Sequence, residues 1–276
     1  MENLLWHGLK IRPSMTSSYP DCNLRGLAKG YPDLFRRLGL KINPLTPSIA
    51  AAVGTGTHAG ARVMMTAKLG GGDLGDPEQA VAEAVAALRV EAENGYMADD
   101  ATPNLNTAEQ QVIRMVGCYR AHVAPKITPV AVETRVEAAM DDGFFVSGQA
   151  DVVCLEPGGI DDLKTGAVQR SAMAQLGTYS LVYRPHGHEV EWLRQTFIPR
   201  VRLKDPQPAP DEVYYPVALA ERVAEMALAR IRRDLIALCE TGDPLVVEAN
   251  SMSSLCSSKW CPLHGTPTCR QHRGAS

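Results

Sequence analysis

The residues of this 276-residue chain that are best suited to catalysis are two aspartates and a lysine. They lie in the segment GQADVVCLEPGGIDDLKTG, residues 148–166. Asp151 belongs to one extended segment, and Asp162 and Lys164 belong to the next, after a Pro-Gly-Gly turn. Because side chains alternate between the two faces of a strand, Asp162 and Lys164 project together. If the two segments pair as a hairpin, Asp151 lies beside Asp162.

This combination of two carboxylates and a lysine favours metal-dependent hydrolysis. Neighbouring carboxylates repel each other, and a hard divalent cation such as Mg²⁺ relieves the repulsion. Water bound to the cation has a lowered pKa and becomes a better nucleophile. A lysine on the same face orients that water or stabilises negative charge in the transition state. The alternative is an exposed Asp162–Lys164 ion pair, which explains most Asp-x-Lys sequences in strands.

Three of the seven cysteines form a second cluster, Cys256, Cys261 and Cys269, within the last 21 residues. In a reducing compartment, such a cluster indicates a metal or iron–sulfur site more than disulfides. A local zinc site completed by His264 or His272 is one alternative, and a metal-free cluster is another. The cysteines in apolar patterns are expected to be buried thiols: Cys118, Cys154 and Cys239.

The composition is that of an ordinary globular protein, with 45% hydrophobic and 21% charged residues. This excludes a disordered, collagenous or coiled-coil chain. A net charge of -3, from 28 basic and 31 acidic residues, argues against a polybasic binder but leaves room for a local basic groove. No membrane-spanning segment and no signal peptide are predicted, so the expected location is the cytoplasm.

The elements that must position these residues follow from periodicity, capping residues and turns. Helices are expected over 25–39, 49–69, 76–96, 107–123, 171–183 and 216–241, and strands over 130–138, 143–156, 160–165 and 190–199. The prediction is one α/β domain spanning 1–276. It has a helical N-terminal part (1–128), a catalytic αβ core (129–200), and a C-terminal helix with an irregular, Cys-rich tail (201–276).

Five short motifs occur in order along these elements. They are Gly54-x-x-x-His58, Glu133 in VAVE, Gly148-x-x-Asp151, Asp162-x-Lys164-Thr-Gly, and Gln175-x-x-x-Tyr179. In this order, the motifs resemble those of the RecB-like branch of the PD-(D/E)XK nuclease superfamily, over roughly residues 14–270. The resemblance implies the restriction-endonuclease-like core of that superfamily, a mixed sheet flanked by helices.

The resemblance also implies a role for each matching residue. Asp151 and Asp162 would bind Mg²⁺ or Mn²⁺, with His58 as a further ligand. Lys164 would be the catalytic lysine. The remaining members of the implied catalytic set are Glu133, with Glu137 as a nearby alternative, and Gln175 and Tyr179, which would contact DNA or brace the site. The simpler alternatives are that His58 caps a loop and that Tyr179 is a core residue.

Many RecB-like nucleases hold a [4Fe–4S] cluster with one N-terminal and three C-terminal cysteines. By this resemblance, Cys22 would join Cys256, Cys261 and Cys269 and connect the two ends of the chain. Four residues separate Cys256 from Cys261, where the family often has two. Structural Zn²⁺ therefore stays open as the alternative.

The function implied is a metal-dependent DNA exonuclease that acts on single-stranded DNA or DNA with free ends. Small RecB-like exonucleases of this type occur in phages and CRISPR systems, so a phage-encoded chain would act in the host cytoplasm. Two alternatives stay open: a non-catalytic DNA-binding or partner-binding protein with the nuclease fold, and a structure-specific DNA or RNA endonuclease.

Overall fold

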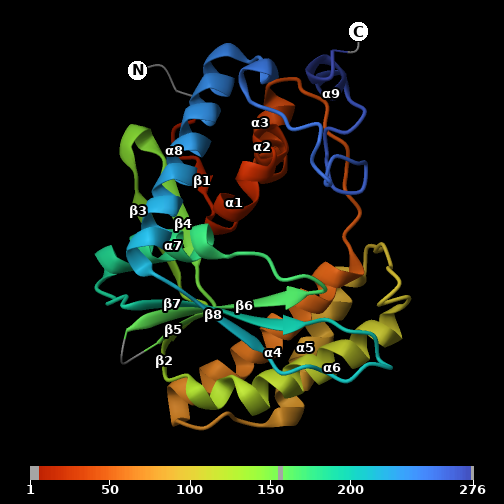
Figure 1. The fold of residues 1–276 in the computed structure, drawn as a ribbon, viewed down its shortest axis with the longest axis vertical. Helices are drawn as coiled ribbons and strands as arrows, with labels where there is room; N and C mark the ends of the chain where they lie inside the picture. The colour runs from red at the N-terminus through yellow and green to blue at the C-terminus, as the bar shows by residue number, and fades with distance from the viewer. Residues whose placement is uncertain (1–5, 155–157, 275–276) are drawn as a thin grey trace.

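The computed structural model describes residues 6–154 and 158–274, which form two sheets and two layers of helices (Figure 1). The larger sheet has the order β2-β5-β6-β7-β8, and the smaller has the order β1-β4-β3. Their bounds are β1 Lys10–Ile11, β2 Pro129–Val132, β3 Arg135–Ala139, β4 Phe145–Gln149, β5 Val152–Cys154, β6 Gly159–Gly166, β7 Trp192–Pro199 and β8 Asp211–Tyr215. The mixed sheet flanked by helices is the architecture of the PD-(D/E)XK core that the motifs implied.

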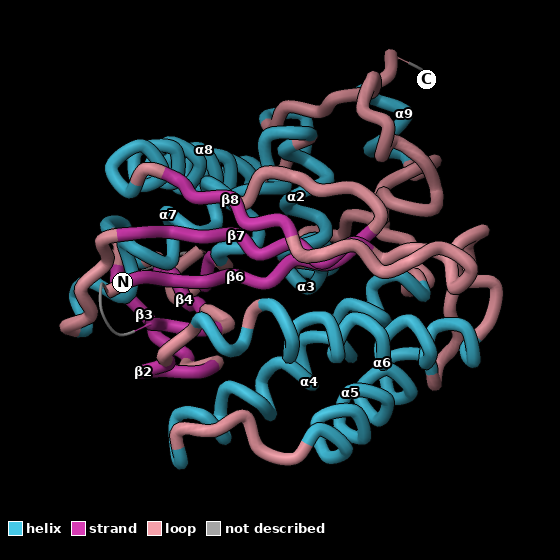
Figure 2. Tube along the Cα trace, turned by 60° about the horizontal axis from the view of Figure 1, so that its bottom comes forward, coloured by secondary structure: helices cyan, strands magenta, loops and turns pink. Residues whose placement is uncertain are grey.

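The helices cover both faces of the larger sheet (Figure 2). Helices α4, α5 and α6 lie on one face, and α7 and α8 lie on the other. The bounds are α1 Pro13–Ser18, α2 Asn23–Gly30, α3 Pro32–Arg37, α4 Ile49–Gly71, α5 Pro77–Ala92, α6 Leu105–His122, α7 Met173–Tyr183, α8 Val217–Thr241 and α9 Pro267–His272. No helix in the described part of the chain is long and apolar enough to cross a membrane.

The central strand β6 separates two hydrophobic cores. Leu163 packs into the core under α4, α5 and α6, whereas Ile160 packs into the core under α7 and α8. This alternation puts Asp162 and Lys164 on the same side of the strand as Ile160. Strand β5 pairs with β6 antiparallel, with Val152 opposite Asp161, and β7 pairs with β6 parallel across the α7 connection. The predicted hairpin before Asp162 is therefore confirmed.

The helix caps explain where the long helices begin. The Ser48 side chain accepts the backbone N–H of Ala51 at the start of α4, and Asp76 caps α5 as the sequence predicted. Helix α6 is capped by Asn104, so the expected start at residue 107 was two residues late. The helix expected over 25–39 is two helices, because the chain turns at Tyr31 and restarts at Pro32.

Two of the expected strands are each divided between the two sheets. The run 130–138 becomes β2 and β3, and the run 143–156 becomes β4 and β5. The chain leaves one sheet for the other near Glu133 and near Asp151, and the backbone N–H of Glu133 donates to the carbonyl of Asp151 at 3.1 Å. Strand β8, an edge strand within 201–276, was not expected from the sequence.

Candidate active site

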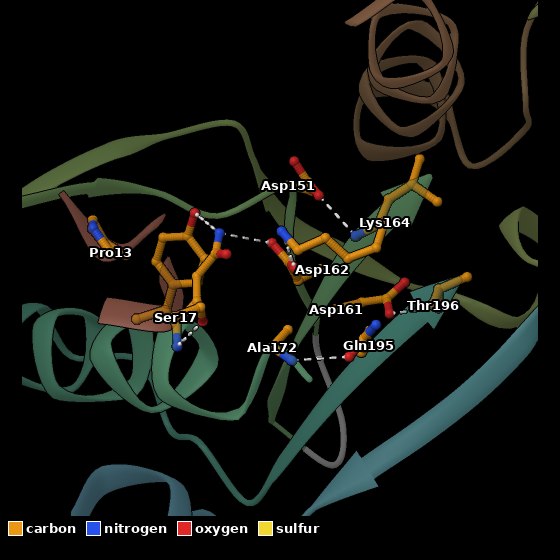
Figure 3. Close-up of polar contacts among 12 residues, drawn as sticks. Pro13, Ser17, Asp151, Asp161, Asp162, Lys164, Ala172, Gln195 and Thr196 are labelled. Atoms are coloured by element: carbon orange, nitrogen blue, oxygen red, sulfur yellow. Dashed lines mark hydrogen bonds and ion pairs between the residues drawn. The ribbon is translucent and has the colours of Figure 1, made fainter. Parts of the chain in front are cut away.

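The structure brings Asp151, Asp162 and Lys164 together at the point where the two sheets diverge (Figure 3). The Lys164 ammonium lies 2.6 Å from Oδ2 of Asp162. Oδ2 of Asp151 accepts the backbone N–H of Leu163 at 2.7 Å, which fixes this carboxylate against β6. The Asp162 side chain is buried, whereas the Asp151 and Lys164 side chains are only partly covered. The group is therefore a buried acid beside two groups that solvent reaches.

The charges in this group change one another's pKa values. Burial, together with the negative charge of Asp151, raises the pKa of Asp162 to about 6 despite the opposing attraction of Lys164. Burial acts to lower the pKa of Lys164, but the two aspartates outweigh it and the pKa is raised. Lys164 is therefore a cation at neutral pH. A proton held this firmly suits Lys164 to supplying positive charge rather than to acting as a base.

His58 reaches the same group from helix α4. Its Nδ1 lies 3.1 Å from Oδ1 of Asp151, on the other carboxylate oxygen from the one held by Leu163. The aspartate raises the pKa of His58 against the effect of burial, and His58 in turn contributes to a lowered pKa of Asp151. Gly54, one turn earlier, lets α4 approach β6, since a Cβ there would lie 2.9 Å from the Thr165 hydroxyl.

Helix α7 supports Asp162 from the opposite side. The Gln175 amide donates to Oδ1 of Asp162 at 3.4 Å and to the Tyr179 hydroxyl at 3.1 Å. Gln175 and Tyr179 are one turn apart on the same face of the helix, and both are buried. Gln175 therefore holds the Asp162 carboxylate directly, and Tyr179 holds Gln175.

Glu133 lines the solvent-exposed edge of this site, whereas Glu137 does not belong to it. The Glu133 carboxylate accepts from Gln149 at 3.3 Å and lies 3.8 Å from the Arg62 guanidinium. Burial and the charge of Asp151 raise its pKa. Its backbone φ of 43° is in the left-handed region, which an L-residue adopts at a cost. Glu137 instead pairs with Lys10 in the smaller sheet.

A cleft opens from these side chains along helix α4. It is lined by one face of that helix, including His58 and Arg62, together with Glu133, Lys164 and Thr165. Arg62 was not singled out from the sequence. The sequence did carry a signal for Arg62, because it follows His58 by one helical turn and therefore lies on the same face of the helix.

The donor set suits a hard divalent cation, although the side chains are not arranged around one. Among residues 6–154 and 158–274, no three His, Cys, Asp or Glu side chains are positioned to share a metal ion. The implied ligands form bonds to protein groups instead: Asp151 with His58, and Asp162 with Lys164 and Gln175. Oδ2 of Asp162 is fully enclosed and has no aligned hydrogen bond, only the ion pair with Lys164. A carboxylate oxygen that has no hydrogen-bond donor is a suitable ligand for a hard divalent cation.

The four cysteines implied as cluster ligands line a second cavity, which shares no residue with the active-site cleft. Cys22, at the start of α2, meets Cys256, Cys261 and Cys269 there. Two N–H groups donate to sulfur: Arg273 Nη2 to Cys256 at 2.9 Å, and the backbone N–H of Asn250 to Cys22 at 3.3 Å. Of the histidines in the local zinc alternative, His272 lines this cavity. The cysteines expected to be buried thiols are buried: Cys118, Cys154 and Cys239.

A mixed sheet flanked by helices, carrying two aspartates and a lysine on neighbouring strands, defines the class as a nuclease fold. The sequence matches the family model for the PD-(D/E)XK nuclease superfamily over residues 24–266. The chain belongs to this superfamily, whose members generally use divalent metals such as Mg²⁺.

One solved structure supports this fold. A crystal structure of an exonuclease candidate from Eubacterium rectale is 13% identical, with a TM-score of 0.51, and the match covers 90% of this chain and 86% of that one. A second structure, SSO0001, is also 13% identical over 70% of this chain and 80% of that one, but its TM-score of 0.28 is too low to support an argument. No curated protein matched the sequence.

Proposed function

We propose that this chain is a metal-dependent deoxyribonuclease of the RecB-like branch, acting as an exonuclease on single-stranded DNA or DNA with free ends. The observation that carries the proposal is the convergence of Asp151, Asp162 and Lys164 beside an open cleft. The superfamily supports nuclease chemistry. The preference for single strands and ends rests on the motif resemblance.

In this proposal Asp151, Asp162 and His58 would hold a divalent cation, and Glu133 lies in the lining of the same cleft as His58. The cation, when bound, would polarise the scissile phosphate and acidify a water molecule. Lys164 supplies a fixed positive charge to the phosphate as negative charge builds on its oxygens. Gln175 and Tyr179 hold Asp162 in the orientation required for metal binding. Arg62 lies where it would attract the incoming backbone.

The test is digestion of end-labelled linear and circular single-stranded DNA with Mg²⁺ or Mn²⁺. We expect metal-dependent release of nucleotides from linear DNA and no cutting of circles. Lys164→Ala should lower kcat on the order of 10²–10³-fold, by analogy with the loss of one transition-state donor. Lys126→Ala is the matched control, because Lys126 also forms a close ion pair, at 2.7 Å with Glu212, outside the site.

Each result bears on the proposal. A folded, metal-supplied protein that cuts neither substrate would refute nuclease activity and leave a DNA-binding scaffold. Cutting of circular DNA, or of RNA in preference to DNA, would refute the exonuclease assignment while keeping the metal site. Full activity of Lys164→Ala would show that the lysine has no catalytic role.

We further propose that the cysteine cavity holds a [4Fe–4S] cluster. The proposal rests on the motif resemblance and on the position of Cys22, Cys256, Cys261 and Cys269 around one cavity. Four cysteine thiolates are the usual ligand set of such a cluster, and structural zinc is the alternative. Two N–H groups are directed at the sulfurs of Cys22 and Cys256, and hydrogen bonds to sulfur are a common feature around such clusters.

A further inference from the structure

A third cavity, separate from the active-site cleft, lies between helices α1 and α2 and is basic. Its polar lining comes from Arg12, Ser14, Ser18, Arg25 and Lys29, and no acidic residue lines it. The chain as a whole has a net charge of -3, so three cations around one cavity are not a consequence of general basicity. Such a cavity has the chemistry of an anion site.

Two of the three cations are free to bind a ligand. Arg12 and Lys29 are exposed, and neither makes an ion pair or a side-chain hydrogen bond with any residue that the structure describes. The nearby Lys10, by contrast, is paired with Glu137 at 2.6 Å. These unpaired cations and the Ser14 hydroxyl are donors with no carboxylate among the residues that line the cavity. The Ser18 hydroxyl already donates to the backbone carbonyls of Ser14 and Met15.

The third cation is built into the wall of the cavity. Arg25 is only 6% exposed, and one edge of its guanidinium is fixed by Asp21 at 2.7 Å. Its Nε is enclosed and has no hydrogen-bond partner among the described residues. A buried N–H without an acceptor is costly in a folded protein, and an anion in this cavity would add negative charge beside it.

The basic cavity is mechanically connected to the active site through α1. Pro13, which lies between Arg12 and Ser14 (Figure 3), packs against Gly148, where a Cβ would lie 2.7 Å from Pro13 Cγ and 3.2 Å from Cε1 of Tyr179. The hydroxyl of Ser17 on the same helix accepts the backbone N–H of Gln175. Since Gln175 and Tyr179 brace Asp162, the basic cavity begins a few residue contacts from the catalytic carboxylates.

We propose that the basic cavity binds a phosphate group of the nucleic-acid strand that is being cut, a few nucleotides from the scissile bond. The ligand chemistry is a phosphodiester or terminal phosphate held by Arg12 and Lys29, with the Ser14 hydroxyl as a further donor. This inference rests on the proposed nuclease function and adds to it a second anchoring point for the strand. Arg12 and Lys29 are positioning residues, because they do not touch the reacting atoms.

The experiment measures binding without cutting. In a Lys164→Ala background, the affinity for a short single-stranded DNA is measured over a series of salt concentrations, with and without Arg12→Ala/Lys29→Ala. Each released counterion contributes about 0.7 to the slope of log K against log salt for a single strand. We expect the double substitution to reduce the magnitude of the slope by about 1 and to weaken binding several-fold at low salt.

A matched control substitutes one arginine and one lysine elsewhere. Arg222 and Lys41 are also exposed and without an ion pair among the described residues, and neither lines the cavity. Arg222→Ala/Lys41→Ala should leave the slope unchanged. Arg12→Gln/Lys29→Gln keeps part of each side-chain stem and should reproduce the loss if charge is the cause. An unchanged slope in the Arg12/Lys29 variants, or an equal fall in the control, would overturn the proposal.

Two further arms separate the sources of phosphate. If the cavity holds a terminal phosphate, removal of the 5′-phosphate or 3′-phosphate from the probe should weaken binding to the intact cavity only. If it holds an internal phosphodiester, the end group should make no difference and the slope should still fall in the double variant. Binding is measured in the Lys164→Ala background and does not depend on cutting. An inactive wild type would therefore refute the nuclease function, whereas the binding data would still test whether the basic cavity holds phosphate.

Discussion

Asp162 lies in an environment that disfavours its own negative charge. It is buried next to a second carboxylate, and its pKa is raised to about 6 even though Lys164 is 2.6 Å away. Ionising this side chain in the folded protein therefore costs free energy relative to the unfolded chain. A site that tolerates this cost is arranged for a positive ligand, and this is the physical reason to expect a cation there.

Asp162→Asn should stabilise the metal-free protein at neutral pH. An acid with a raised pKa keeps its proton in the folded state while the unfolded state releases it, so wild-type stability falls as the pH rises from about 4 to about 6. The asparagine variant lacks this loss. Urea unfolding in EDTA should show the variant gaining stability relative to wild type over that interval, with a constant difference above it.

Addition of Mn²⁺ or Mg²⁺ should reverse this order, because only the wild type gains binding energy from the cation. Asp33→Asn, at an exposed aspartate, is the control and should change neither the pH dependence nor the metal response. If Asp162→Asn proves less stable than wild type in EDTA at pH 7, the buried carboxylate is stabilised by its protein partners and the argument for a cation position fails.

At the scale of the elements, strand alternation was sufficient to predict that Asp162 and Lys164 share a face and that a hairpin precedes them. The position of His58 depended on more, since α4 is distant in sequence and approaches β6 only because Gly54 leaves room for Thr165. The motif resemblance anticipated this encounter, whereas periodicity carried no information about it.

The division of two strands between the sheets could not be predicted from the local pattern. Extended residues continue through Glu133 and Asp151 with no glycine or proline to mark the change, and the left-handed φ of Glu133 is imposed by tertiary contacts. Strand β8 was missed for a related reason. It is a short edge strand that follows a Pro-rich loop, and its pairing with β7 depends on tertiary context and not on the local sequence.

The packing of α7 on α8 gives a prediction at this scale. A Cβ on Gly177 would lie 2.0 Å from the Ala220 carbonyl oxygen, so Gly177→Ala must separate the two helices. We expect it to lower the free energy of unfolding by about 1–3 kcal/mol, the usual cost of overpacking. Nuclease activity should also fall, because α7 carries Gln175 and Tyr179.

Gly117→Ala provides the comparison. Gly117 lies inside helix α6 with open space around its Cβ position, so alanine should stabilise the protein by roughly 0.5–1 kcal/mol. Urea denaturation of both variants measures the difference. Equal effects from the two substitutions would mean that the contact between α7 and Ala220 is not a tight one.

At the scale of the whole molecule, the cysteine cavity joins the two ends of the chain. Cys22 and Asn250 are in contact across 228 residues of sequence, and Cys256, Cys261 and Cys269 lie around the same cavity. A cluster bound there would hold α1 and α2 against the C-terminal segment. The basic cavity would be stabilised with them, because Arg25 lines both cavities.

The final prediction is that Cys256→Ser removes the cluster and loosens this end of the molecule. Anaerobically purified wild type should contain about four iron atoms and four sulfides per chain, and the variant should lose them. Since binding of a cluster is coupled to folding, the variant's Tm should fall by about 5–10 °C. Cys118→Ser is the control, because its side chain keeps a hydrogen bond to the Pro208 carbonyl and lies outside the cavity. A colourless wild type with one zinc ion would contradict the iron–sulfur proposal. A Tm unchanged by Cys256→Ser would show that the cavity does not connect the chain ends.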